Sequence, residues 1–94
     1  MGSGSLHALH LSGIGLTSLA PLQLALACPN LRLLDVSHNS LTSLEGIGGL
    51  PLLRVLDASY NRFDPVTGIA ASLSELATGC PSLESLDLRG AGGT

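Results

Sequence analysis

The stretch CPNLRLLDVSHNSLTSL, from Cys28 to Leu44, gathers residue types that carry out chemistry in other proteins. A cysteine, an aspartate, a serine and a histidine occur within it, and these are the residue types of metal sites and catalytic triads. Asp35, Ser37 and His38 supply the three side chains of a serine, histidine and aspartate triad. Whether they can act together depends on the elements that position them.

The whole chain is built from one repeated pattern, L-x-x-L-x-[LVA]. It begins at Leu6, Leu31, Leu53 and Leu83, so the starts lie 25, 22 and 30 residues apart. Each L-x-L segment predicts a short strand whose leucines face a core while the intervening residues face solvent. Because one such repeat cannot bury its own apolar side, the repeats must stack on one another.

The pattern resembles the leucine-rich repeat family, L-x-x-L-x-L-x-x-N-x-L. Asn39 and Asn61 occupy the asparagine position of the two central repeats, and Ile14 and Ala91 occupy it in the outer two. The resemblance implies an α/β solenoid with a short parallel β-sheet on its concave face. Helices, 3₁₀ turns and loops are expected on the convex face. The asparagine amide is expected to tie the turn that follows each strand.

The resemblance covers residues 6–94, divided into repeats 6–30, 31–52, 53–82 and an incomplete 83–94. We expect residues 1–5, MGSGS, to be an added tag or linker. We also expect the chain to be a fragment of a larger protein, with open ends through which it could form homo-oligomers.

The spacing predicts strands at about 8–11, 33–36, 55–58 and 85–88. The connection TSLEGIGGLPLL resembles the short SDS22-like repeats of protein phosphatase regulators, which use 3₁₀ or irregular turns. The first connection contains ACPNL, which resembles the acidic nuclear phosphoprotein 32 family, and it predicts a short helix starting near Pro21.

The longest connection, DPVTGIAASLSELATGCPSL, predicts a true helix. Asp64 can cap it, with Pro65 at the first helical position and Gly79 at its end. Helical spacing predicts one apolar face, made of Ile69, Leu73, Leu76, Ala77 and Cys80.

The cysteines fit a core better than a chemical site. Cys28 and Cys80 each lie three residues before a repeat start, a position that Leu50 holds in the third repeat. The intervening repeat should separate them by about 10 Å, which is too far for a disulfide. Free thiols suit a reducing compartment, so we expect an intracellular protein, in the cytoplasm, at the cytoskeleton or cilium, or in the nucleus.

The triad also separates when its members are placed on the repeat. Asp35 and Ser37 should be successive outward residues about 6–7 Å apart, and His38 should turn away toward the strand end. We therefore predict no catalytic, cofactor-binding or metal-binding residues and no enzymatic activity.

Equal positions of adjacent strands should lie side by side, in rows across the exposed face of the sheet. The predicted rows are His10, Asp35, Asp57 and Asp87; Ala8, Leu33, Val55 and Ser85; His7, Arg32, Arg54 and Glu84; Ser12, Ser37, Ser59 and Arg89; and Gly13, His38, Tyr60 and Gly90. Phe63, by contrast, holds a core position.

The row of aspartates has two interpretations. Three carboxylates in a row should repel one another and raise their own pKa values, with Arg32 and Arg54 near enough to relieve this. The row is then either a solvated face or an acidic strip that attracts a basic segment of a partner. Aromatic and arginine side chains often anchor protein interfaces. The candidate protein-binding residues are therefore Leu33, Asp35, Arg54, Val55, Asp57, Tyr60 and Asp87.

Composition narrows the classes of partner. The net charge is −3 and the four basic residues are all arginine, so we expect no nucleic-acid binding. No apolar run approaches the roughly 18 residues of a membrane span. The function expected is a non-enzymatic protein-interaction module, or scaffold, that binds through its concave face. The alternative is a purely structural segment of a larger solenoid or multidomain protein.

Overall fold

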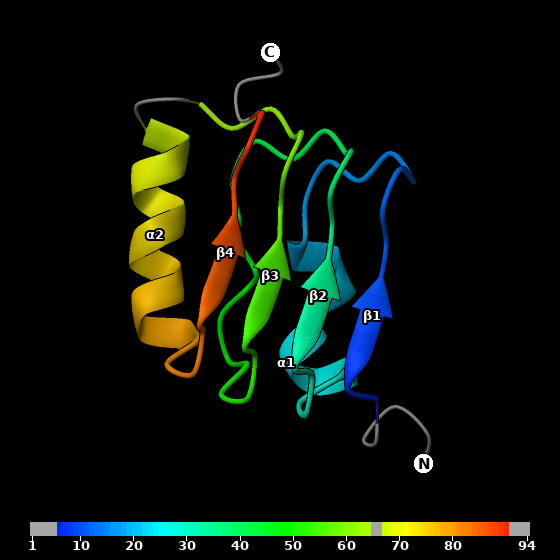
Figure 1. The fold of residues 1–94 in the computed structure, drawn as a ribbon, viewed down its shortest axis with the longest axis vertical. Helices are drawn as coiled ribbons and strands as arrows, with labels where there is room; N and C mark the ends of the chain where they lie inside the picture. The colour runs from blue at the N-terminus through cyan, green and yellow to red at the C-terminus, as the bar shows by residue number, and fades with distance from the viewer. Residues whose placement is uncertain (1–5, 65–66, 91–94) are drawn as a thin grey trace.

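Four short strands form one parallel sheet in the computed structural model, which describes residues 6–64 and 67–90. They are β1 (Ala8–His10), β2 (Leu33–Asp35), β3 (Val55–Asp57) and β4 (Ser85–Asp87), in the order β1-β2-β3-β4. Figure 1 shows them side by side in chain order. The four predicted strands are confirmed, although each regular strand ends one residue before its predicted limit. The α/β repeat architecture is thus plain from the order of its elements.

The register of the sheet pairs equal positions of neighbouring repeats. Ala8 pairs with Leu33, Leu33 with Val55, and Val55 with Ser85. The aspartate positions pair in the same way, from His10 at one edge to Asp87 at the other. The predicted rows through the strands are therefore confirmed.

The backbone ladder continues past the regular strands by one repeated set of hydrogen bonds. Leu11, Val36 and Ala58 each donate their N–H to the aspartate carbonyl of the next strand, at 2.7 to 2.9 Å. Gly13, His38 and Tyr60 donate in turn to the carbonyls of Ser37, Ser59 and Arg89. Each repeat is thus tied to the next along its whole turn as well as along its strand.

The connections differ in structure, as the sequence predicts. The first contains the 3₁₀ helix η2 (Ala20–Leu22) and the short helix α1 (Leu24–Ala27), which confirms the helix expected near Pro21. Between β2 and β3 the chain makes turns and bends without a helix.

The third connection forms the long helix α2 (Thr67–Gly79), which ends at the predicted glycine. The first-turn position predicted for Pro65 lies outside the described residues, as do residues 1–5 and Ala91. The Asp64 cap stays a prediction, while the Asp64 carbonyl accepts the Ile69 N–H at 3.1 Å.

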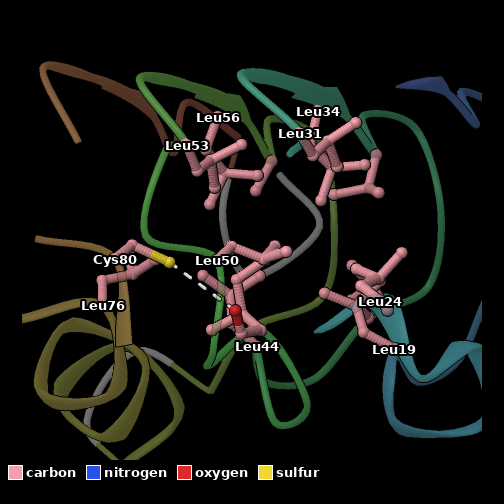
Figure 2. Close-up of a cluster of buried hydrophobic side chains, with 14 of the residues drawn as sticks. Leu19, Leu24, Leu31, Leu34, Leu44, Leu50, Leu53, Leu56, Leu76 and Cys80 are labelled. Atoms are coloured by element: carbon pink, nitrogen blue, oxygen red, sulfur yellow. Dashed lines mark hydrogen bonds between the residues drawn. The ribbon is translucent and has the colours of Figure 1, made fainter. Parts of the chain in front are cut away.

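A core of aliphatic side chains fills the space between the sheet and the connections. Figure 2 shows strand-side leucines 31, 34, 53 and 56 facing a second set from the connections, which includes Leu24, Leu44, Leu50 and Cys80. The predicted core positions are confirmed as buried: Cys28, Leu31, Leu34, Val36, Leu41, Leu44, Phe63 and Cys80. The core takes in residues from all four repeats, so the described chain folds as one unit.

Two buried asparagines close the turns between repeats. The Asn39 Oδ1 accepts the N–H groups of Ile14 and Leu16, both at 3.0 Å. Its amide nitrogen donates to three carbonyls, those of Leu11, Val36 and Ser37. Asn61 binds the next turn in the same manner. The predicted role of the asparagines is confirmed, because each satisfies backbone groups that would otherwise be buried without partners.

The apolar face of α2 is only partly as predicted. Leu76 and Cys80 are buried and Ile69 packs against the core, but Leu73 is 47% exposed and Ala77 is also exposed.

The helix packs on the turn before it through small residues. A Cβ added at Gly79 would lie 2.5 Å from the Gly48 Cα, and the buried Ser72 hydroxyl accepts the Leu44 N–H at 3.0 Å. Leu73 and Ala77 instead flank a groove of about 290 Å³ that Pro81, Leu83 and Leu86 also line. Helical spacing alone misplaced Leu73 and Ala77 because small and polar residues make the closest contact. No helix among the described residues combines the length and the apolar character that a bilayer crossing requires.

Candidate protein-binding face

The side of the sheet opposite the core carries the candidate residues, and we call this side the open face. In β2 the middle residue, Leu34, is buried, whereas Leu33 and Asp35 on either side of it are half-buried. Val55 lies beside Leu33 and is 37% exposed. Of the other candidates, Asp57 and Asp87 continue the aspartate row, while Arg54 precedes β3 and Tyr60 follows it. The strand register brings five of the seven candidates into two adjacent rows.

Asp35 is held by its own turn. Its Oδ1 accepts the Ser37 hydroxyl at 2.7 Å and the Ser37 N–H at 3.0 Å, and its Oδ2 lies 3.7 Å from the His10 Nδ1. The Ser37 hydroxyl holds the pKa of Asp35 below its ordinary value, against the opposing effect of burial.

Asp87 is held by a cation instead. Its carboxylate accepts hydrogen bonds from the Arg89 guanidinium, with the Nη2 to Oδ2 distance at 2.7 Å. These hydrogen bonds lower the pKa of Asp87 and raise that of Arg89.

Asp57, between them, keeps one oxygen unused. Its Oδ1 accepts the Ser59 hydroxyl at 2.6 Å and the Ser59 N–H at 3.1 Å. Its Oδ2 makes no hydrogen bond to the part of the chain that the structure describes. Asp57 therefore has acceptor capacity left at the middle of the open face.

Two predictions about this row were wrong. The pKa values of Asp35 and Asp87 are lowered and not raised, because the hydroxyl and guanidinium donors outweigh the raising effect of burial. Relief does not come from Arg54, which forms an ion pair with Glu84 at 3.0 Å. Arg32 makes no ion pair within the described residues.

The serine row is confirmed where Ser12 and Ser37 lie side by side, with their hydroxyl oxygens 3.0 Å apart. Its two central members are not exposed as predicted, because Ser37 and Ser59 are only 5% and 4% exposed. The Ser37 hydroxyl turns toward Asp35 and donates directly to its carboxylate at 2.7 Å. The repeated sequence pattern D-x-S could have predicted this contact, since serine and aspartate side chains often form hydrogen bonds with groups two residues away.

The contacts do not assemble a triad. A serine nucleophile needs an imidazole beside its hydroxyl, with the carboxylate behind that imidazole. Here Asp35 stands between Ser37 and His10, so the hydroxyl contacts the carboxylate and not a histidine. Among the described residues no three His, Cys, Asp or Glu side chains are grouped so that they could hold a metal ion. Cys28 and Cys80 are buried free thiols, and burial raises the pKa of Cys80.

The stacking of two aromatic rings, those of His38 and Tyr60, was not predicted from the sequence. The rings of His38 and Tyr60 stack with centroids 4.7 Å apart and planes 11° from parallel. Tyr60 is 46% exposed, so the pair presents ring surface to solvent at the carboxyl ends of β2 and β3. The row of Gly13, His38, Tyr60 and Gly90 was the signal that places the two rings on adjacent strands.

Comparison with known proteins identifies the family of the chain. A family model described as a leucine rich repeat matches residues 4–63, which is more than half of the chain. No curated protein and no solved structure matches significantly.

Proposed function

Because this chain belongs to the leucine-rich repeat family, whose domains generally mediate protein–protein interaction, we propose that it binds a protein partner through its open face. In this proposal the module is non-enzymatic and its repeats form a curved solenoid with the open face on the concave side. Its buried thiols suit a reducing compartment, so the proposal includes an intracellular location.

The observation that carries the proposal is the unused oxygen of Asp57. The Asp35 Oδ2 lies 3.7 Å from the His10 Nδ1, and both oxygens of Asp87 accept from Arg89, whereas the Asp57 Oδ2 has no hydrogen bond or ion pair within the described residues. Leu33, Val55 and Tyr60 surround this position with partly exposed apolar surface. A charged acceptor beside such surface suits a partner segment that offers a basic side chain next to an apolar one.

The distribution of arginines favours a protein over a polyanion. Arg54 and Arg89 are paired with Glu84 and Asp87, so two of the four cations are neutralised within the chain. Nucleic acid and anionic membrane surfaces require several unpaired cations on one side of a protein.

The test compares Asp57→Asn and Val55→Asp with the wild-type chain in affinity capture of bound proteins. Asp57→Asn keeps an Oδ1 that can still accept from Ser59, so we expect the fold to survive while the basic partner is lost. Glu45→Gln is the control, because Glu45 is an exposed acid on the connection between β2 and β3. Identical sets of captured proteins from all four chains would contradict the proposal.

A structural role with self-association is the second candidate. The groove beside α2 and β4 is apolar, and β4 and β1 are the two edges of the described sheet. The ladder between repeats would continue if β1 of a second copy followed β4. The N–H groups of Leu88 and Gly90 would then donate to the carbonyls of His10 and Ser12, as Ala58 and Tyr60 donate to Asp87 and Arg89 within the chain.

Such head-to-tail contact leaves one edge open at each end, so it grows into longer assemblies. Sedimentation velocity over a concentration series should show mass rising without a fixed limit, and Leu73→Glu in the groove should abolish the rise. A monomer at every concentration would contradict this second candidate.

A further inference from the structure

The turn after each strand places one residue in a left-handed backbone conformation. The four residues are Gly13, His38, Tyr60 and Gly90, with φ values of 68°, 55°, 55° and 67°. Glycine adopts this conformation freely, whereas residues with side chains do so at a cost. The two central repeats therefore carry rings at positions where glycine serves in the outer two.

The ring pair is enclosed on one side by the next turn. A Cβ added at Gly90 would lie 2.5 Å from the Tyr60 Cδ1, so only glycine leaves room for the Tyr60 ring there. Together with its stacking on His38, this contact fixes the Tyr60 ring between two turns. The rings are thus preorganised, and strained backbone of this kind often occurs at ligand sites.

An open pocket of about 470 Å³ lies beside these rings, and we call it the ring pocket. It is lined by His38, Tyr60, Ser40, Arg62 and Gly90, with Asn39 and Asn61 behind them. The two asparagine amides are occupied by backbone groups of the turns. The side chains of Ser40 and Arg62 make no hydrogen bond or ion pair within the described chain.

The charge of the ring pocket is unusual for this chain, whose net charge is −3. No carboxylate lines it, and Arg62 is exposed there. The pocket at the opposite ends of the strands also contains arginines, but Glu84 lines it and pairs with Arg54. The ring pocket therefore offers donors from Arg62, Ser40, His38 and Tyr60 with no anion of its own to receive them.

We propose that the ring pocket binds one anionic oxygen group, a carboxylate or a phosphate monoester carried by a partner. Arg62 supplies the opposing charge, since a guanidinium presents paired donors that match either group. Tyr60 and His38 pack against the chain that carries the group, and their polar atoms add donors to its oxygens. The ring pocket shares Tyr60 with the open face, but its charge comes from Arg62 and not from Asp57, so it does not require the proposed binding of a basic segment.

The test is a titration of the isotopically labelled chain, followed by NMR, with N-acetylglutamate and with phosphoserine at constant ionic strength. We expect saturable shifts of the Arg62 side chain and the His38 and Tyr60 ring signals. Arg62→Gln should weaken the interaction at least tenfold. The matched control is Arg32→Gln, because Arg32 is also exposed and without an ion pair in the described chain but lies at the opposite ends of the strands.

The two probes distinguish the sources of the anionic group. Tighter saturation by phosphoserine identifies a phosphorylated partner, and tighter or equal saturation by N-acetylglutamate identifies an acidic one. His38→Gly gives an independent check, because glycine keeps the backbone conformation while removing the ring, so binding should weaken with the fold intact. Equal responses of wild type, Arg62→Gln and Arg32→Gln, or shifts that never saturate, would overturn the proposal.

Discussion

The middle of the repeat array and its two edges use the same residue at the same position with different results. Leu34 and Leu56 are 0% and 1% exposed, whereas Leu9 and Leu86 at the equivalent positions of β1 and β4 are only partly buried. The four leucines share the same strand position and the same side of the sheet. Burial in this fold therefore depends on having a repeat on both sides, and residue type alone does not determine it.

Replacing a leucine by alanine in the middle and at the edge of the sheet should give the largest difference in the free energy of unfolding. Leu34→Ala should lower the free energy of unfolding by about 3–4 kcal/mol, because it opens a cavity in close-packed surroundings. Leu86→Ala should lower it by about 1–2 kcal/mol, since part of that side chain already contacts water. Urea denaturation of the two variants measures both values. Equal losses would mean that the edge is as well packed as the middle.

The asparagine of the second repeat, which binds the turn of the first, offers the next largest effect. Asn39→Ala should cost about 2–3 kcal/mol, because it leaves buried N–H and C=O groups without partners. Ile14→Ala, at the corresponding position of the first repeat, should change stability by less than about 0.5 kcal/mol, since that side chain is exposed. A large loss in the isoleucine variant would show that the edge repeat depends on its own residue at this position.

A smaller loss is expected where α2 docks on the preceding turn. The Ser72 hydroxyl accepts the Leu44 N–H and donates to the Gly68 carbonyl, and both bonds are buried. Ser72→Ala should therefore cost about 1–2 kcal/mol in the same urea measurement. Ser74→Ala, on the exposed side of the same helix, is the control and should be close to neutral.

The pKa values of Asp35 in the middle of the sheet and of Asp87 at its edge allow the same comparison for charged groups. The pKa of Asp35 is lowered below 3.8, so its carboxylate stabilises the fold above that pH, and this stability is lost as pH falls through the folded pKa. Ser37→Ala should raise the pKa of Asp35 toward its ordinary value. Arg89→Gln should do the same for Asp87, as measured by NMR titration. Added salt should raise the pKa of Asp87 more than that of Asp35, because exposed charges are screened.

The sequence was sufficient for the features that depend on periodicity. The leucine spacing located the four strands, the L-x-x-L-x-L alignment gave their register, and the length of the third connection indicated α2. Failures occurred where contacts between elements decide the outcome. The exposed flank of α2 at Leu73 and Ala77 depends on glycine and serine contacts with an earlier turn, which helical periodicity does not encode.

The candidate site shows the same division. Alignment was enough to bring Asp35, Asp57 and Asp87 into one row, since strand register follows from the repeat. It did not separate the three, because their second oxygens depend on different neighbours. A serine two positions later binds one oxygen of both Asp35 and Asp57, but only Asp35 has His10 beside its other oxygen, and Arg89 binds both oxygens of Asp87. The stacking of His38 on Tyr60 similarly needs the left-handed turn, which is uncommon for any residue other than glycine.

The two buried thiols, Cys28 and Cys80, allow local unfolding of the chain to be measured by chemical modification. Cys28 precedes β2 and Cys80 precedes β4, and each is shielded until the elements above it separate. Cys80 also lines the groove beside α2, so a fraying of that helix would expose it while Cys28 stayed covered. Under native conditions the ratio of their modification rates therefore measures how far the array unravels from one end before it unfolds as a whole.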